Sequence, residues 1–115
     1  NVLGSTAVIT DTDQVIAVSG NSSVRDLKEK PISRQLTGIM EQKRSVLTPQ
    51  REACYITDDD RYSDSYRSQV VVPIVSQGDT IGSIILLSTE SMLGDIELKA
   101  AEVGAAFIAK QMELN

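Results

Sequence analysis

The chain has 115 residues, the size of one domain, and it carries 11 basic and 16 acidic residues for a net charge of −5. This balance argues against direct nucleic-acid binding, because phosphate contacts draw on clustered Lys and Arg. The lack of histidine and the single cysteine exclude Ser-His and Cys-His nucleophilic pairs, an internal disulfide and a multi-cysteine zinc site.

The N-terminal part of the chain predicts a hairpin followed by two helices. Two short apolar runs separated by turn residues indicate strands at 6–10 and 15–19. A weak capping pattern over residues 23–26 predicts a short helix across Leu27. Apolar residues then recur at helical spacing over about residues 32–43, which predicts a second helix.

The C-terminal part predicts three more strands and a long helix. Residues 51–57 are expected to form a short strand, and the polar stretch 57–68 a loop. Two apolar runs within 70–88, separated by turn residues at 76–79, predict a hairpin of strands that are buried on both faces. The predicted fold class is therefore α+β, an antiparallel sheet with helices packed against it.

The long C-terminal helix has two apolar seams where a surface helix needs only one. At about 100° per residue, one seam contains Ile96, Ala100, Val103, Phe107 and Leu114. The opposite seam contains Leu98, Ala101, Ala105, Ile108 and Met112. We therefore expect the helix to lie between its own sheet and a partner subunit, or a helix that lies outside this sequence. The sequence does not assign the seams, but the large Phe107 favours the first for the core, which leaves the second as the candidate oligomer interface.

No group of residues has the pattern of a catalytic or metal site. The aspartates within 58–64 lack the glycine and the terminal glutamate of an EF-hand loop, so we interpret them as a solvated loop. Cys54 alternates with the apolar Ile56 and has no histidine to activate it, which favours a small buried hydrophobe over a nucleophile. We predict that the chain is not an enzyme, with a thiol-dependent reductase as the less favoured alternative.

One pattern near the C-terminus is similar to GAF domains, and longer segments resemble a particular family. The pattern is PI-x(3)-G-x-x-IG-x-I over residues 73–84, followed by the amphipathic helix. The segments VIAVSGNSS, ISRQL, MEQKRSVL, PIVSQGDTIGSIILLS and GDIELKAAEVGAAFIAKQME resemble the C-terminal domain of the stage V sporulation protein T family. These proteins are transcription regulators of endospore-forming bacteria. The resemblance covers nearly the whole chain, 1–115, and is weakest over 51–67.

The resemblance implies a single regulatory domain, 1–115, with a GAF-like central antiparallel sheet of five to six strands. It implies an AbrB-type DNA-binding domain upstream, so that DNA is contacted only through that missing domain. It also implies a helix before the first strand that forms a bundle between subunits with the C-terminal helix. We expect self-association, as a homodimer or higher oligomer, or binding of a small molecule to be coupled to DNA binding. A purely structural dimerisation platform without a ligand is the alternative.

By analogy with GAF domains, the resemblance places a ligand pocket beneath the loop 57–68. The residues expected to line it are Met40, Cys54, Ile56, Val70 and Val72. No cofactor is implied, because the chain lacks the cyclic-nucleotide motif, has no histidine for haem, and has too few cysteines for a methionine sulfoxide reductase. No apolar run near 18 residues and no signal peptide are present, so we predict no membrane partner. One thiol fits a cytoplasmic location. The chain does not begin with Met, and we expect it to be part of a longer protein.

Overall fold

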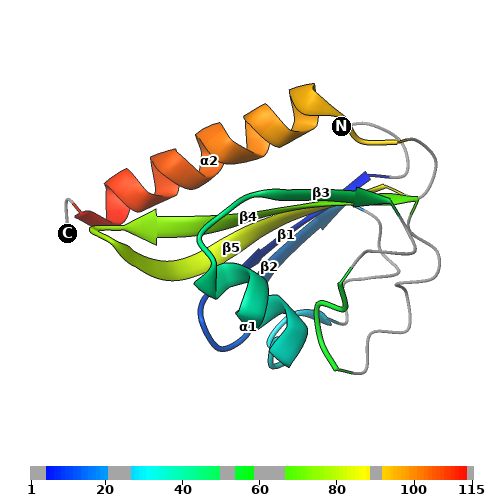
Figure 1. Cartoon of the computed structure of the whole chain (residues 1–115). Coiled ribbons are helices and arrows are strands. Elements are labelled where there is room, and N and C mark those ends of the chain that lie inside the picture. The colour runs from blue at the N-terminus through cyan, green and yellow to red at the C-terminus, as the bar shows by residue number, and fades with distance from the viewer. Residues whose placement is uncertain (1–4, 21–26, 50–53, 59–66, 89–91, 114–115) are drawn as a thin grey trace.

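The domain is built on an antiparallel sheet of five strands. The computed structural model describes residues 5–20, 27–49, 54–58, 67–88 and 92–113. In chain order the elements are β1 (Ser5–Thr10), β2 (Val15–Gly20), α1 (Arg34–Glu41), β3 (Val46–Pro49), β4 (Ser68–Ser76), β5 (Asp79–Ser88) and α2 (Asp95–Glu113). The strand order across the sheet is β2-β1-β5-β4-β3. The helix α2 covers one face of the sheet and α1 lies on the other (Figure 1). The predicted α+β class is confirmed.

Both predicted hairpins are present, and local turn chemistry explains each. In the first, Asp11 Oδ1 accepts hydrogen bonds from the backbone N–H groups of Asp13 and Gln14, at 2.7 and 2.8 Å. An aspartate that bonds its own backbone in this way stabilises a turn. In the second, Gln77 and Gly78 have φ angles of 53° and 87°, the left-handed conformation that two-residue turns between twisted strands require.

The helix predicted over residues 32–43 is confirmed as α1, which is slightly shorter at both ends. Ser33 is its N-cap, and Ser33 Oγ accepts a hydrogen bond from the Leu36 N–H at 3.0 Å. Of the other predicted helix, the described part contains only Leu27, which has 3₁₀-helical conformation and is followed by a turn at residues 28–29. Residues 23–26 lie outside the described part.

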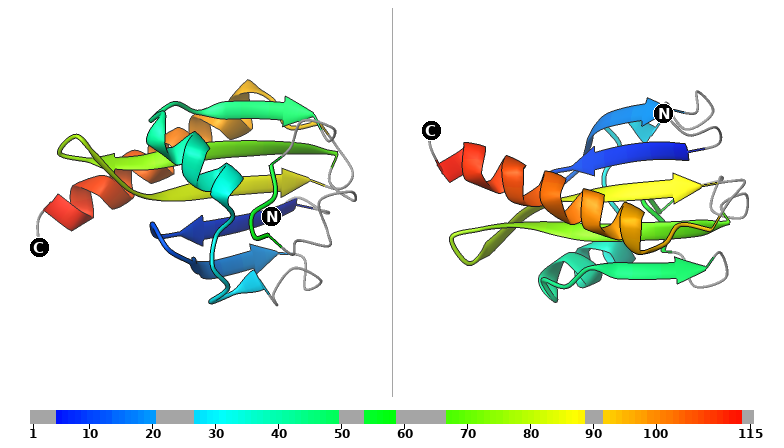
Figure 2. Two further views of the ribbon diagram at one scale, coloured as in Figure 1. Left: turned by 60° about the horizontal axis from the view of Figure 1, so that its bottom comes forward. Right: turned by 90° about the horizontal axis from the view of Figure 1, so that it is seen from above.

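The central strand β4 separates two apolar cores. Its side chains alternate, so Val70, Val72 and Ile74 pack with α2, whereas Val71 packs in the cluster on the α1 side. Figure 2 shows α2 across one face, and α1 with the segment 54–58 across the other. The expectation that this hairpin is buried on both faces is therefore confirmed.

The prediction of a strand over residues 51–57 is wrong for residues 54–57, the part of it that the structure describes. Residues 54–57 form an irregular segment, and the strand at this edge of the sheet is the earlier β3. The error has a physical reason. Cys54 and Ile56 are buried while Tyr55 is exposed, which is the alternation of a strand without the pairing of one. Of the predicted loop 57–68, residues 59–66 lie outside the described part of the chain.

Candidate functional site

The inner side of α2 is built from small residues, which lets the helix lie close to the sheet. Ala101, Ala105 and Ala109 are buried in the cluster that the helix forms with β4 and β5. At Gly104, an added Cβ would lie 3.3 Å from Ile84 Cδ1, so even a methyl group would be tight there. Close approach of this kind excludes large side chains from the inner side.

The outer side of α2 is apolar and exposed. Ile96, Val103 and Phe107 keep 82%, 62% and 64% of their surface accessible, and Ala100 between them is also exposed. These four residues, which we call the outward seam, recur at intervals of four, three and four. That spacing is typical of the contact line of a coiled coil. Leu114, the fifth residue of this predicted seam, lies outside the described residues.

The structure corrects the assignment of the two seams. The predicted interface residues Leu98, Ala101, Ala105 and Ile108 pack against the domain's own sheet, and of that set only Met112, near the end of the helix, is largely exposed. The expectation that Phe107 belongs to the core is wrong for the same reason. A phenyl ring on the inner side would hold the helix away from the sheet, whereas alanine does not.

A local cap at the start of α2 and one hydrogen bond to the residue before β3 hold the helix in place. Glu97 Oε1 accepts a hydrogen bond from the Gly94 N–H at 2.7 Å, which satisfies a free donor just before the helix. Near the middle of α2, Ser45 Oγ donates to Glu102 Oε2 at 2.8 Å. The outward seam is therefore presented in a defined direction.

Beside α2, the sheet is partly uncovered. The helix packs on β4 and β5, and it leaves the same face of β1 and β2 open (Figure 2, right). Ile9 of β1 and Leu86 of β5 are half-buried there, and Ala17 of β2 is exposed. The apolar surface of the domain thus continues from α2 onto the sheet.

The predicted ligand pocket is not one pocket in this structure. Met40, Cys54 and Ile56 belong to the core on the α1 side, whereas Val70 and Val72 point to the α2 side, and β4 separates the two groups. The prediction is wrong because it placed residues of the wrong parity in β4 on the pocket side. All five side chains are buried, so they fill the core.

Gln69 holds the irregular segment onto the sheet. The Cys54 N–H donates to Gln69 Oε1 at 2.8 Å, and Gln69 Nε2 donates to the Cys54 carbonyl oxygen at 3.0 Å. The glutamine side chain is itself 1% exposed. Sequence reasoning missed Gln69, although a polar residue at the start of the apolar run of β4 is a signal that could have identified it.

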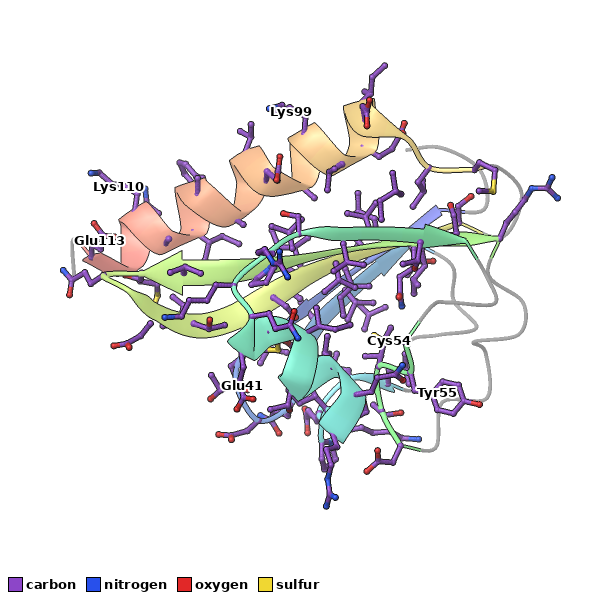
Figure 3. All side chains as sticks on the ribbon, viewed as in Figure 1. Glu41, Cys54, Tyr55, Lys99, Lys110 and Glu113 are labelled. Carbon is purple, nitrogen blue, oxygen red and sulfur yellow. The ribbon has the colours of Figure 1, made fainter. Side chains whose placement is uncertain are left out.

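The start of α1 holds the next two residues of the segment. Ser33 Oγ donates to the Tyr55 carbonyl oxygen, and the Ser33 N–H donates to the Ile56 carbonyl oxygen at 2.7 Å. The Tyr55 N–H donates to Gln35 Oε1 at 3.1 Å. The Tyr55 ring projects away from the sheet (Figure 3). We call residues 54–57, held in this way, the strap.

Described residues also line some small hollows on the surface. Three of these hollows have volumes of about 250, 230 and 190 Å³. The first lies beside α1 and β3, the second between α2 and β4, and the third between α1 and β5. Ligand sites usually start at about 300 Å³. Within the described ranges no three His, Cys, Asp or Glu side chains gather as metal ligands, and no helix could span a membrane. Most of the loop aspartates lie outside these ranges.

Solved structures with low sequence identity share this fold. A GAF domain/HD domain protein from Geobacter sulfurreducens is 19% identical, with a TM-score of 0.68 over 97% of this chain and 83% of that one. The blue-light absorbing form of the Thermosynechococcus elongatus PixJ GAF domain is 17% identical, with a TM-score of 0.67 over 95% and 76%. A type II free methionine-R-sulfoxide reductase from Thermoplasma acidophilum is 16% identical, with a TM-score of 0.68 over 91% and 76%. The domain has the GAF fold, as predicted.

Sequence comparison gives the family. Residues 1–113 match the family described as stage V sporulation protein T C-terminal, transcription factor. Stage V sporulation protein T of Bacillus subtilis (strain 168) is 39% identical over 111 residues, which make up 96% of this chain. The chain belongs to this family. It spans 61% of the length of that relative.

Proposed function

We propose that this domain is a regulatory assembly module that pairs the outward seam of α2 with a second copy of the chain. The exposed apolar line on a helix that is already packed on its other side carries this proposal. Pairing sets the separation of the two N-termini, and thereby the spacing of DNA-binding domains that the family resemblance places upstream. The transcription-factor family of the chain supports such a role.

The energetics indicate what else must contribute to the dimer. The exposed parts of Ile96, Val103 and Phe107 add up to about two whole side chains, and burying them stabilises by roughly 3–6 kcal/mol per protomer. Association costs about 4–15 kcal/mol. Burial of both seams therefore outweighs the cost of association only over part of the range given for that cost. A stable dimer needs further apolar contact.

The uncovered part of the sheet is positioned to supply that contact. A helix that lies alongside α2 over β1 would cover Ile9 and Leu86 and also touch the small residues on the flank of α2. The family resemblance implies a helix immediately before β1. We propose that this helix and α2 of each protomer form a bundle between the two copies.

Of the two expected functions, self-association and binding of a small molecule, the second has less support. The position expected for a pocket is filled by Cys54 and Ile56, which favours the assembly function over a sensor with an open site. A reductase function has less support still, because such an enzyme needs an accessible thiol and the Cys54 thiol is buried in the packed domain. The structural similarity to a methionine sulfoxide reductase concerns the fold alone.

Analytical ultracentrifugation tests the assembly proposal. We expect the 115-residue chain to sediment as a monomer–dimer equilibrium that shifts with concentration, and a longer chain that includes the preceding segment to dimerise more tightly. Monomers at all concentrations for both chains would contradict the proposal. A dimer that is equally tight with and without the preceding segment would contradict the bundle but not the pairing of α2.

A further inference from the structure

The outward seam of α2 has a spacing that is the same in both directions along the helix. Its residues follow one another at intervals of four, three and four: Ile96, Ala100, Val103 and Phe107. If a second copy of the helix runs antiparallel, Ile96 can lie opposite Phe107. In the same register Ala100 lies opposite Val103, so all four positions face one another at once. A parallel second copy would instead place each residue opposite itself.

The sizes of these side chains favour the antiparallel direction. In a parallel pair, Ala100 would meet its own copy, and about two turns further along Phe107 would meet its own copy. Two phenyl rings hold the helices further apart than two methyl groups can bridge, so a gap would remain at the alanines. In an antiparallel pair, Ala100 faces the larger Val103, and Phe107 faces the smaller Ile96. Large residues opposite small ones fill the space between two elements more evenly.

The charges on α2 favour the same direction. Lys110 follows Phe107 by three residues and so continues the outward seam, and like Lys99 it projects away from the sheet (Figure 3). In a parallel pair Lys110 would face its own copy, and like charges so close repel. In an antiparallel pair it lies beside the start of the other helix, where Asp95 is exposed. Asp95 and Lys110 are about 60° apart around the helix, on one flank, and an antiparallel pair brings these two flanks together.

We propose that two copies of α2 pair antiparallel through the outward seam, with Lys110 of each copy beside Asp95 of the partner subunit. This inference rests on the proposed assembly function and adds the direction of pairing to it. The occupant of the seam is a second copy of this chain, because the spacing, the side-chain sizes and the charges of α2 are all complementary to α2 itself.

The direction of pairing decides where the two chains enter the assembly. Ser5 at the start of β1 pairs with Ser88, which also pairs with Ser68. Ser68 Oγ accepts a hydrogen bond from the Leu93 N–H at 2.7 Å, just before α2 begins. The starts of β1 and α2 therefore lie at the same end of the domain. Antiparallel pairing separates the two starts of β1 by on the order of 28 Å, the length of a helix of 19 residues. Upstream domains would thus leave the pair from opposite ends.

Disulfide trapping distinguishes the two directions. Ile96→Cys is introduced into one chain and Phe107→Cys into another, and Cys54 stays in place because it is buried. A disulfide needs Cα atoms within about 7 Å of each other. In an antiparallel pair the two copies of residue 96 lie on the order of 16 Å apart along the helices. At a concentration at which sedimentation shows the dimer, oxidation of the mixture is expected to give the mixed disulfide. Each variant alone is expected to link no faster than Arg34→Cys, at an exposed position of α1.

Charge reversal tests the ion pair separately. Lys110→Glu is expected to raise the dissociation constant about 2- to 30-fold, because the dimer contains two such exposed pairs. Adding Asp95→Lys to the same chain should restore most of the affinity, since the pair is then re-formed with its signs exchanged. Arg34→Glu makes the same change of charge on α1 and should leave the dissociation constant unaltered.

The outcomes separate a failure of this inference from a failure of the assembly function. Linking of Ile96→Cys chains to one another as fast as the mixture links would show a parallel pair, which overturns the direction and retains the assembly. A dimer in sedimentation that forms no disulfide in the mixture or with either variant alone would show that the outward seam is not the contact, which overturns both. A double variant that dimerises no more tightly than Lys110→Glu would overturn the ion pair.

Discussion

The replacement Phe107→Glu tests whether the outward seam is an interface. Phe107 is mostly exposed in the isolated domain, so a glutamate there should change the free energy of unfolding of the monomer by less than about 0.5 kcal/mol. If Phe107 is buried between two copies, the same change removes apolar contact from both sides of the interface. The variant should therefore fold normally and fail to dimerise.

The size of the effect follows from the exposed fraction of the side chain. With 64% of Phe107 available for burial, each copy loses about 1–2 kcal/mol, and a symmetric dimer loses about 2–4 kcal/mol. The dissociation constant should rise roughly 30- to 700-fold. Burial of the carboxylate adds to this loss.

Sedimentation equilibrium measures the dissociation constant, and urea denaturation measures the stability of each variant. Gln42→Glu is the matched control, because it adds the same charge at an exposed position on the α1 side of the sheet. Ala105→Glu places the charge on the buried seam and should cost about 3–5 kcal/mol of folding free energy. An unchanged dissociation constant for Phe107→Glu would refute the interface, and unfolding of both α2 variants would refute the assignment of the seams.

Substitutions at three further positions test the fold by urea denaturation. Gly82→Ala should destabilise by about 3 kcal/mol, because its Cβ would lie 2.2 Å from the backbone carbonyl oxygen of Thr10; a neutral result would show that β1 can move aside. Gly38→Ala should stabilise by about 0.5–1 kcal/mol, because the site is helical and open, and any loss of stability contradicts that geometry. Ser33→Ala should cost about 1–2 kcal/mol through loss of the cap to the Leu36 N–H, whereas Ser33→Thr should retain most of the stability.

The elements with strong local signals were predicted well from the sequence. The turn residues at 11–14 and 76–79 and the apolar runs beside them are sufficient for the two hairpins, because turn geometry and strand pairing are both decided locally. The same holds for α1, whose capping serine and apolar spacing lie within one short segment.

Elements that depend on distant partners were predicted poorly. β3 has only four residues, and it forms because it pairs with the edge of β4. Its own residues therefore give only a weak indication of a strand. In the strap, buried and exposed side chains alternate as they do in a strand, although the strap pairs with no strand, so the sequence pattern wrongly predicts one there. Its hydrogen bonds come from Gln69 and from the start of α1, which the chain brings together only after folding.

The sequence by itself determined that β4 alternates between two cores and that α2 has two apolar seams, because both are properties of the local repeat of a strand or a helix. Only the tertiary structure decided which side of each repeat faces which neighbour. Ala101 and Ala105 face the sheet because small side chains let the helix approach it closely, which leaves Phe107 outside. Val71 rather than Val70 or Val72 faces the strap, because the register of β4 with β5 sets the parity of the whole strand.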